Sequence, residues 1–217
     1  MPLTFYALSG SPFSWKVWLA LEHLTVPYDL RVLSADAGDL ESPALLGLNP
    51  RRKVPVIVDD GFALPESSAI IEYLEDVHGQ TGRSVWPSDP RARAIARRLA
   101  AEADGYIYPA VRRLVVELVM RRDGAPDPSG IAESSASLAG EFGRLDGLVT
   151  DAFLAGDVPS AADYALYPLT AILMWVDAKA PSYDLARVIG ERVRSWRAHV
   201  EALPNFAKTL PPHWRTA

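Results

Sequence analysis

The segment KVPVIVDDGFALPESSAIIEYL, residues 53–74, decides the fold of this chain. Valine occupies every second position from Val54 to Val58, and such a β-branched alternation predicts a strand. Asp60-Gly61 then supplies two residues that tolerate a positive φ in a tight turn, and residues 62–64 form the returning strand. The segment therefore begins with an antiparallel hairpin.

A helix follows the hairpin, and both elements predict a binding site. The apolar side chains at the helical period are Ile70, Tyr73, Leu74 and Val77. Pro55 lacks a ladder donor near the start of the first strand, and a cis bond after Val54 would let an extended peptide pair with the outward backbone of Val54. Glu66 and Ser67 stand at the helix start, where unpaired N–H groups favour an anion. We expect the ligand to be a small, extended peptide that carries a carboxylate.

The first 33 residues predict a strand, a helix and a second strand. Residues 3–8 and 28–33 alternate in polarity, and Ser9 to Pro12 breaks the first pattern as a turn. The helix between them buries a stripe that consists of Val17, Ala20, Leu21 and Leu24. A strand, helix, strand unit implies a parallel pair of strands. With a loop-rich stretch and then the hairpin and helix, the order βαβ–ββα is that of a thioredoxin-like domain.

The chain changes character after residue 78. Residues 78–90 are rich in turn formers and carry no apolar period, which marks a domain boundary. We predict an α+β protein with a thioredoxin-like domain at 1–80, a linker at 81–89 and an all-helical domain at 90–217. Four apolar periods predict at least four helices in the second domain. Ser160-Ala161-Ala162-Asp163, an acidic variant of the capping box, should begin the third.

Composition excludes several classes of function. The 217 residues are 49% hydrophobic, which is ample for a packed core, and the net charge of -5 argues against a nucleic-acid partner. With no Cys, the chain has neither a thiolate nucleophile nor a thiolate metal site. The four histidines, His23, His78, His199 and His213, are too far apart in sequence for a metal motif, so we expect no metal. No segment predicts a membrane span or a leader, and we expect a cytoplasmic protein.

The motif NPRRKVP, residues 49–55, together with PESSAIIEYL, residues 65–74, resembles the glutathione-binding segment of the glutathione S-transferase family. The resemblance implies that Val54, before a cis Pro55, offers its backbone to the cysteinyl part of glutathione. It also implies that Glu66 and Ser67 hold the γ-glutamyl carboxylate, and Lys53 could pair with the glycyl carboxylate. Arg52 departs from the family pattern, because many members have Gly there.

Residues 11–17, SPFSWKV, resemble the active-site turn of the serine-type and cysteine-type transferases. The resemblance implies that the hydroxyl of Ser11 donates a hydrogen bond to the glutathione thiolate. Lowering a thiol pKa from about 8.5 by two units requires about 2.7 kcal/mol. A hydrogen bond to a charged group contributes about 1.5–3 kcal/mol and a helix terminus about 0.3–1, so the two suffice. Tyr6, in the position of the tyrosine-type hydroxyl, and the neighbouring Ser9 and Ser14 remain alternatives.

The second domain is expected to contribute to the pocket for the other substrate. Its candidate residues are Asp104, Tyr106, Tyr108, Arg112, Arg113 and Trp175, and Phe13 of the first domain joins Tyr106, Arg112 and Trp175 as the predicted electrophile pocket. In the family, an acid on the helix of Asp104 often reaches the glutathione amino group across a dimer interface, which implies a homodimer.

The resemblance implies an enzyme that binds glutathione as a co-substrate, stabilises its thiolate, and conjugates it to a small hydrophobic electrophile or displaces a group there. Isomerase, dehalogenase, ether-cleaving and peroxidase reactions stay open. The alternative is a catalytically weak binding or interaction protein that keeps the transferase fold, because fold does not determine function.

Overall fold

The structure, a computed structural model, describes residues 2–79 and 83–211. The chain divides into two compact units, one formed by Met1–Trp86 with Leu203–Ala217 and the other by Pro87–Ala202. The first two residues of the predicted linker, and His213, lie outside the described residues.

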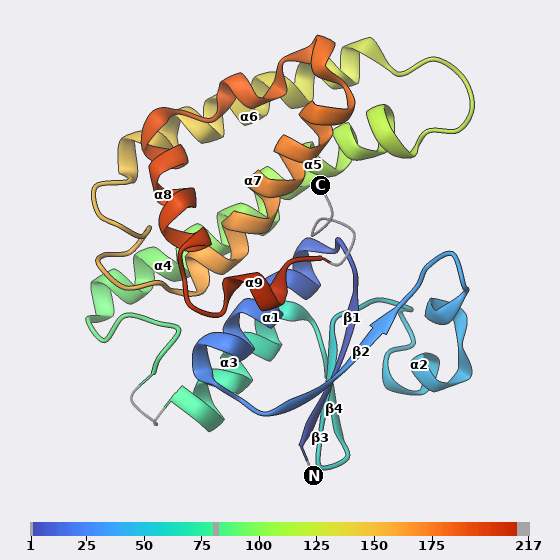
Figure 1. Ribbon diagram of the computed structural model, residues 1–217, viewed down its shortest axis with the longest axis vertical. Helices are drawn as coiled ribbons and strands as arrows, with labels where there is room; N and C mark the ends of the chain where they lie inside the picture. The colour runs from blue at the N-terminus through green and yellow to red at the C-terminus, as the bar shows by residue number, and fades with distance from the viewer. Residues whose placement is uncertain (1, 80–82, 212–217) are drawn as a thin grey trace. The chain divides into compact units, whose positions relative to one another are not determined.

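The first unit is built on a four-stranded mixed sheet (Figure 1). The strands are β1 (Leu3–Leu8), β2 (Tyr28–Leu33), β3 (Val56–Asp59) and β4 (Phe62–Pro65), in the spatial order β2-β1-β3-β4. β1 pairs in parallel with β2 and antiparallel with β3, which pairs antiparallel with β4. This confirms the predicted strand, helix, strand unit followed by a hairpin.

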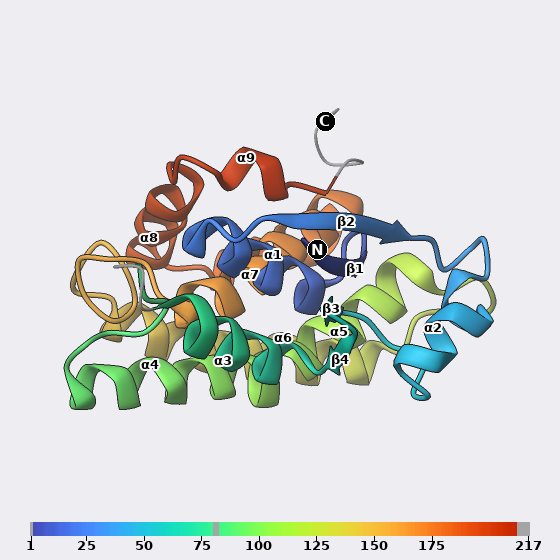
Figure 2. The ribbon, with the colours of Figure 1, turned by 90° about the horizontal axis from the view of Figure 1, so that it is seen from below.

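Helices α1 (Pro12–Leu24) and α3 (Ser67–His78) pack against each other beside the sheet, as Figures 1 and 2 show from two directions. All four residues of the stripe predicted for α1 are buried, and burial extends over every residue from Ser14 to Leu21. The reason is that α1 also contacts the short helix α9 (Phe206–Thr209) from the C-terminal segment. Trp15 donates its indole N–H to Oγ1 of Thr209 at 3.0 Å.

The hairpin turn forms as the sequence predicts. Asp60 has a φ of 45° and Gly61 a φ of 85°, so both turn residues adopt the left-handed conformation that a two-residue hairpin needs. β3 begins at Val56, two residues later than the valine pattern suggests. Pro55 has no N–H to donate to the ladder, and it therefore precedes the strand.

Two details of the first unit differ from the sequence-based expectation. In α3, Val77 is 48% exposed, whereas Ile71 is buried beside Ile70 and Leu74. The buried residues of α3 therefore all lie at or before Leu74, ahead of its last turn. The stretch expected to be loop-rich contains a six-residue helix, α2 (Pro43–Leu48), which is too short to show a period and is capped by Ser42.

The second unit is helical, as predicted. Its helices are α4 (Pro90–Glu102), α5 (Tyr108–Val115), α6 (Pro128–Leu148), α7 (Ala161–Lys179) and α8 (Glu191–Glu201). Two π-helical turns, Ala103–Ile107 and Val116–Met120, flank α5. The four apolar periods correspond to α5, α6, α7 and α8. The apolar periods did not reveal α4, because its only buried residues are Ala96 and Leu99, which lie among arginines.

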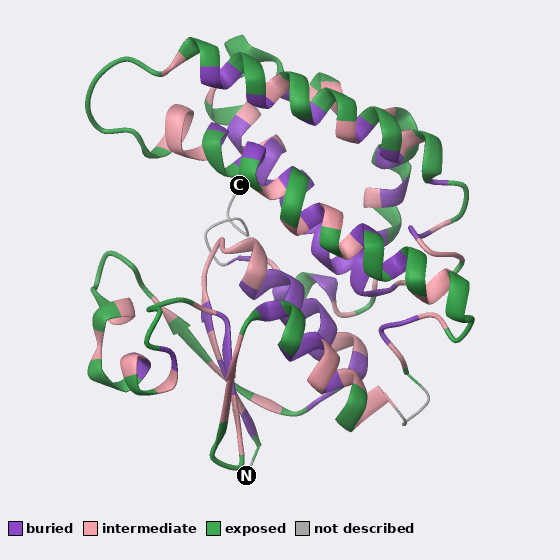
Figure 3. Ribbon diagram, turned by 180° about the vertical axis from the view of Figure 1, so that it is seen from behind, coloured by how far each residue is buried: buried purple, intermediate pink, exposed green. Residues whose placement is uncertain are grey.

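Helix α7 forms the centre of this unit. All residues from Ala161 to Leu173 are buried, so the helix is covered on every side rather than along one stripe (Figure 3). Ser160 is its N-cap residue, and the backbone N–H of Ser160 donates to Oδ2 of Asp163 at 2.7 Å. The helix start predicted from the Ser160–Asp163 box is confirmed. Within the described residues, no helix combines the length and apolar character that crossing a bilayer requires.

Candidate functional site

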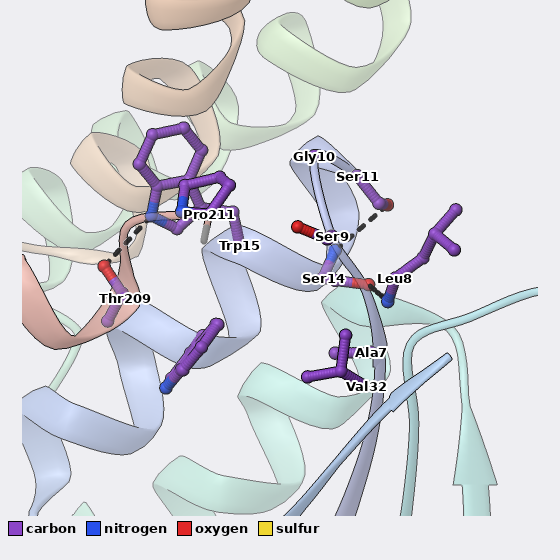
Figure 4. Close-up of a pocket in the computed structure, with 11 residues that line it drawn as sticks. Ala7, Leu8, Ser9, Gly10, Ser11, Ser14, Trp15, Val32, Thr209 and Pro211 are labelled. Carbon is purple, nitrogen blue, oxygen red and sulfur yellow. Dashed lines mark hydrogen bonds between the residues drawn. The ribbon is translucent and has the colours of Figure 1, made fainter. Parts of the chain in front are cut away.

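The turn between β1 and α1 presents Ser11 at a helix start. Ser11 is the N-cap residue of α1, with φ −73° and ψ 122°, and Pro12 occupies the first helical position. Its Oγ accepts a hydrogen bond from Ser14 N–H at 3.3 Å (Figure 4). A hydroxyl that accepts through one lone pair can still donate its proton to an anion. The Ser11 side chain is half-buried, so a ligand can reach it.

The three alternatives to Ser11 lie in different surroundings. Ser14 is buried, and its Oγ accepts from Leu8 N–H at 3.2 Å, which joins the end of β1 to the first turn of α1. Ser9 lines a small pocket beside the turn with Ser11, Trp15 and the C-terminal Thr209. Tyr6 is half-buried in the middle of β1, opposite the buried side chains of the strand. Of the four, Ser11 is the hydroxyl that sits at the helix terminus itself.

The loop before β3 is held by a buried amide that the sequence-based site did not include. Asn49 is 2% exposed, and its Nδ2 donates to the carbonyl of Lys53 at 2.8 Å. Its Oδ1 accepts from Arg51 N–H at 3.1 Å. The Val54–Pro55 peptide bond is cis, and Pro55 is buried. Asn-Pro marks a turn in sequence, yet nothing local indicates that this side chain turns inward.

Arg52 adopts the conformation that glycine favours. Its φ is 57°, in the left-handed region, and its side chain is exposed. The loop therefore keeps a glycine-like backbone although arginine occupies the position. The adjacent Lys53 is also exposed, so its ammonium is open to an anion in solvent.

The start of α3 brings Glu66 and Ser67 into different environments. Glu66 is exposed and occupies the N-cap position with a φ of 75°, while Ser67 is 7% exposed. The helix dipole and the first N–H groups of α3 favour an anion at this end. Val54 and Pro55 lie just before β3, and Pro65, which immediately precedes Glu66, pairs with Val56 in the β3–β4 ladder. The sheet therefore brings the predicted peptide edge and the predicted anion site together.

The predicted residues of the second unit lie on and around α5 and on α7. Asp104 and Tyr106 belong to the π-helical turn Ala103–Ile107, and Tyr106 is 63% exposed. Arg112 is exposed on α5, and Trp175 is half-buried on α7. Arg113, also named as a candidate, pairs with Asp127 at 2.9 Å and Glu133 at 3.1 Å, which joins α5 to the start of α6.

Comparison with known proteins finds glutathione S-transferases by sequence and by structure. The family model "Glutathione S-transferase, N-terminal domain" matches residues 10–77. Glutathione S-transferase 3 of Zea mays is 28% identical over 219 residues, covering 97% of this chain and 96% of the maize protein. Residues 10–77 belong to the N-terminal domain family of glutathione S-transferases, and the chain is similar to members of that family along its whole length. Glutathione S-transferase U8 of Arabidopsis thaliana is 38% identical to this chain over 107 residues, which is 49% of this chain and 46% of the plant protein.

A solved structure has the same fold as this chain along its whole length. The crystal structure of a glutathione S-transferase from the Antarctic clam Laternula elliptica superimposes with a TM-score of 0.81 at 26% identity. The match covers 100% of this chain and 95% of the clam protein. In the described residues of the transferase, no group of three or more His, Cys, Asp or Glu side chains could hold a metal ion.

Sequence reasoning also missed a buried cation in the transferase. Lys16 of α1 is 2% exposed, and its Nζ donates to Oγ of Ser68 on α3 at 3.3 Å. A lysine among the apolar residues of an amphipathic helix predicts a solvated side chain, so its burial follows only from the packing of α1 on α3.

Proposed function

We propose that this transferase binds glutathione at the starts of α1 and α3 and stabilises the thiolate with the Ser11 hydroxyl. Family membership and fold support a glutathione-binding transferase. The observation that carries the finer assignment is the N-cap geometry of Ser11, whose Oγ accepts from Ser14 N–H and keeps its proton for a ligand. The first N–H groups of α1 add positive potential at the same place.

The remaining proposed contacts assign residues of the first unit to the three parts of glutathione. The backbone of Val54 before Pro55 would pair with the cysteinyl part, Glu66 and Ser67 would hold the γ-glutamyl group, and Lys53 would meet the glycyl carboxylate. Two observations support these assignments: Ser67 lies in the first turn of α3, and Lys53 is exposed at the end of the Asn49 loop.

The reaction proposed is conjugation or displacement at a small hydrophobic electrophile. The protein would hold the ionised thiol in place, so that positioning and electrostatics supply the rate enhancement. Phe13, Tyr106, Arg112 and Trp175 as electrophile contacts, Asp104 as a contact to glutathione in a homodimer, and a cytoplasmic location stay predictions.

Calorimetric titration with glutathione in two buffers of different ionisation enthalpy tests the proposal. The expected result is binding with release of close to one proton near neutral pH, and loss of most of that release in Ser11→Ala. Tyr6→Phe should keep it. Binding without proton release would favour the alternative of a catalytically weak binding protein. If proton release is lost in Tyr6→Phe and kept in Ser11→Ala, Tyr6 rather than Ser11 stabilises the thiolate.

A further inference from the structure

The side chain of Lys16 is buried and its ammonium has a defined place. Lysine is almost never fully buried, because removing an ammonium from water is costly unless polar groups receive it. Here only 2% of the residue is exposed, Nζ donates to Oγ of Ser68, and Nζ lies 5.3 Å from the centroid of the Phe13 ring. The ammonium is therefore held where α1 packs on α3 rather than in solvent.

The ammonium lies close to the first turns of two helices. Side chains of a helix lean toward its N-terminus, and the Nζ of Lys16 accordingly reaches Phe13, three residues earlier and two after the N-cap Ser11. Ser68, which accepts a hydrogen bond from Nζ, is the second residue of α3, next to Ser67. Lys16 therefore connects the helix start proposed for the thiolate with the helix start proposed for the γ-glutamyl carboxylate.

We propose that Lys16 is a positioning residue of the glutathione site, and this inference rests on the proposed function. Its ammonium holds the two helix starts in register through Phe13 and Ser68. It also brings a positive charge close to the partial positive charges of both helix ends. Because the charge is buried, solvent screens it weakly, and an anionic ligand at the helix starts is stabilised.

Substitution of Lys16 separates this role from a purely structural link between α1 and α3. Lys16→Met keeps the length and apolar bulk of the side chain and removes the charge. We expect the pKa of the bound glutathione thiol, followed by ultraviolet absorbance of the thiolate, to rise by about one unit, a roughly tenfold loss of thiolate below that pKa. We expect the KM for glutathione to rise several-fold as well. Lys16→Arg, which keeps the positive charge, should leave the thiol pKa and the KM for glutathione close to those of the unsubstituted protein.

Control variants keep the test decisive. Lys208→Met removes an ammonium whose side chain is 65% exposed and should leave the thiol pKa unchanged. If Lys16→Met does not fold, Ser68→Ala removes one hydrogen-bond acceptor of Nζ and should shift the thiol pKa in the same direction by less. The inference is overturned if Lys16→Met lowers the thermal midpoint and leaves thiol pKa and KM unchanged, or if Lys16→Arg behaves as Lys16→Met. Failure of the proposed function is distinct, because the unsubstituted protein would then release no proton on adding glutathione.

Discussion

The indole N–H of Trp196 on α8 donates a hydrogen bond to Oδ1 of Asp163 on α7 at 2.7 Å, across 33 residues of sequence. The same carboxylate accepts from Leu154 N–H at 2.9 Å and from the N–H and hydroxyl of Ser160 at 2.7 and 2.9 Å. Burial raises the pKa of Asp163, and the hydrogen bonds oppose that rise. One fully buried side chain thus caps α7, fixes the preceding loop and anchors α8.

Replacing Asp163 by alanine should destabilise the second unit by about 3–4 kcal/mol. The substitution leaves buried donors without an acceptor, and hydrogen bonds to a charged group contribute about 1.5–3 kcal/mol each before non-additivity. Urea unfolding followed by far-ultraviolet circular dichroism measures the loss. Asp157→Ala, at an exposed position of the same loop, is the matched control and should change stability by less than about 0.5 kcal/mol. Equal effects of the two variants would contradict the role of Asp163.

Ser11 and Ser42 form a natural pair for separating helix capping from catalysis. Each is an N-cap residue followed by Pro, and the Oγ of each accepts a hydrogen bond at 3.3 Å from the N–H three residues on. Alanine at either position should cost about 1 kcal/mol of stability through the lost cap. Only Ser11→Ala should also lower kcat/KM for conjugation, by about 100-fold. The assay uses a chlorinated aromatic electrophile, and a comparable loss in Ser42→Ala would attribute the Ser11 effect to capping.

Arg52→Gly should stabilise the loop before β3. A non-glycine residue at a φ of 57° carries a cost of about 1 kcal/mol that glycine avoids, partly offset by the greater entropy of glycine in the unfolded chain. We expect a net gain of about 0.5 kcal/mol in thermal or urea unfolding. Arg51→Gly removes the same charge at a position without a positive φ and should give no gain. Destabilisation by Arg52→Gly would show that the arginine side chain, rather than the backbone, matters there.

His23 should make the first unit sensitive to mild acid. Burial lowers the pKa of His23, its ring lies 3.2 Å from the Ser84 carbonyl, and nearby Arg83 lowers the pKa further while Glu75 raises it. The unfolded chain therefore binds a proton at a pH where the folded one does not. The contribution of His23 to stability is complete above about pH 6.5 and declines as pH falls toward the lowered folded-state pKa.

Unfolding midpoints at about pH 7.5 and 5.5 measure the effect of His23. His23→Gln, which cannot titrate, should lose less stability over this interval than the unsubstituted protein. An identical loss in both proteins would assign the acid sensitivity to other groups.

Features set by neighbouring residues could be predicted from the sequence. The Asp60–Gly61 turn, the start of α1 at Pro12 and the start of α7 after Ser160 all depend on residues at most a few positions apart. Backbone conformation and capping act over that range, so their signals are contained in short motifs. The placement of the thioredoxin-like domain before the helical one followed from such signals in chain order.

Contacts between distant segments were decided only by the tertiary structure. The burial of Lys16, the inward turn of Asn49, the exposure of Val77 and the bond from Trp196 to Asp163 depend on which helix or loop packs opposite each side chain. The hydroxyl of Thr209 meets the indole of Trp15 across 194 positions, a partnership that no local pattern encodes. Local spacing therefore determined which elements form, and packing determined which of their polar side chains became buried and what those side chains hold.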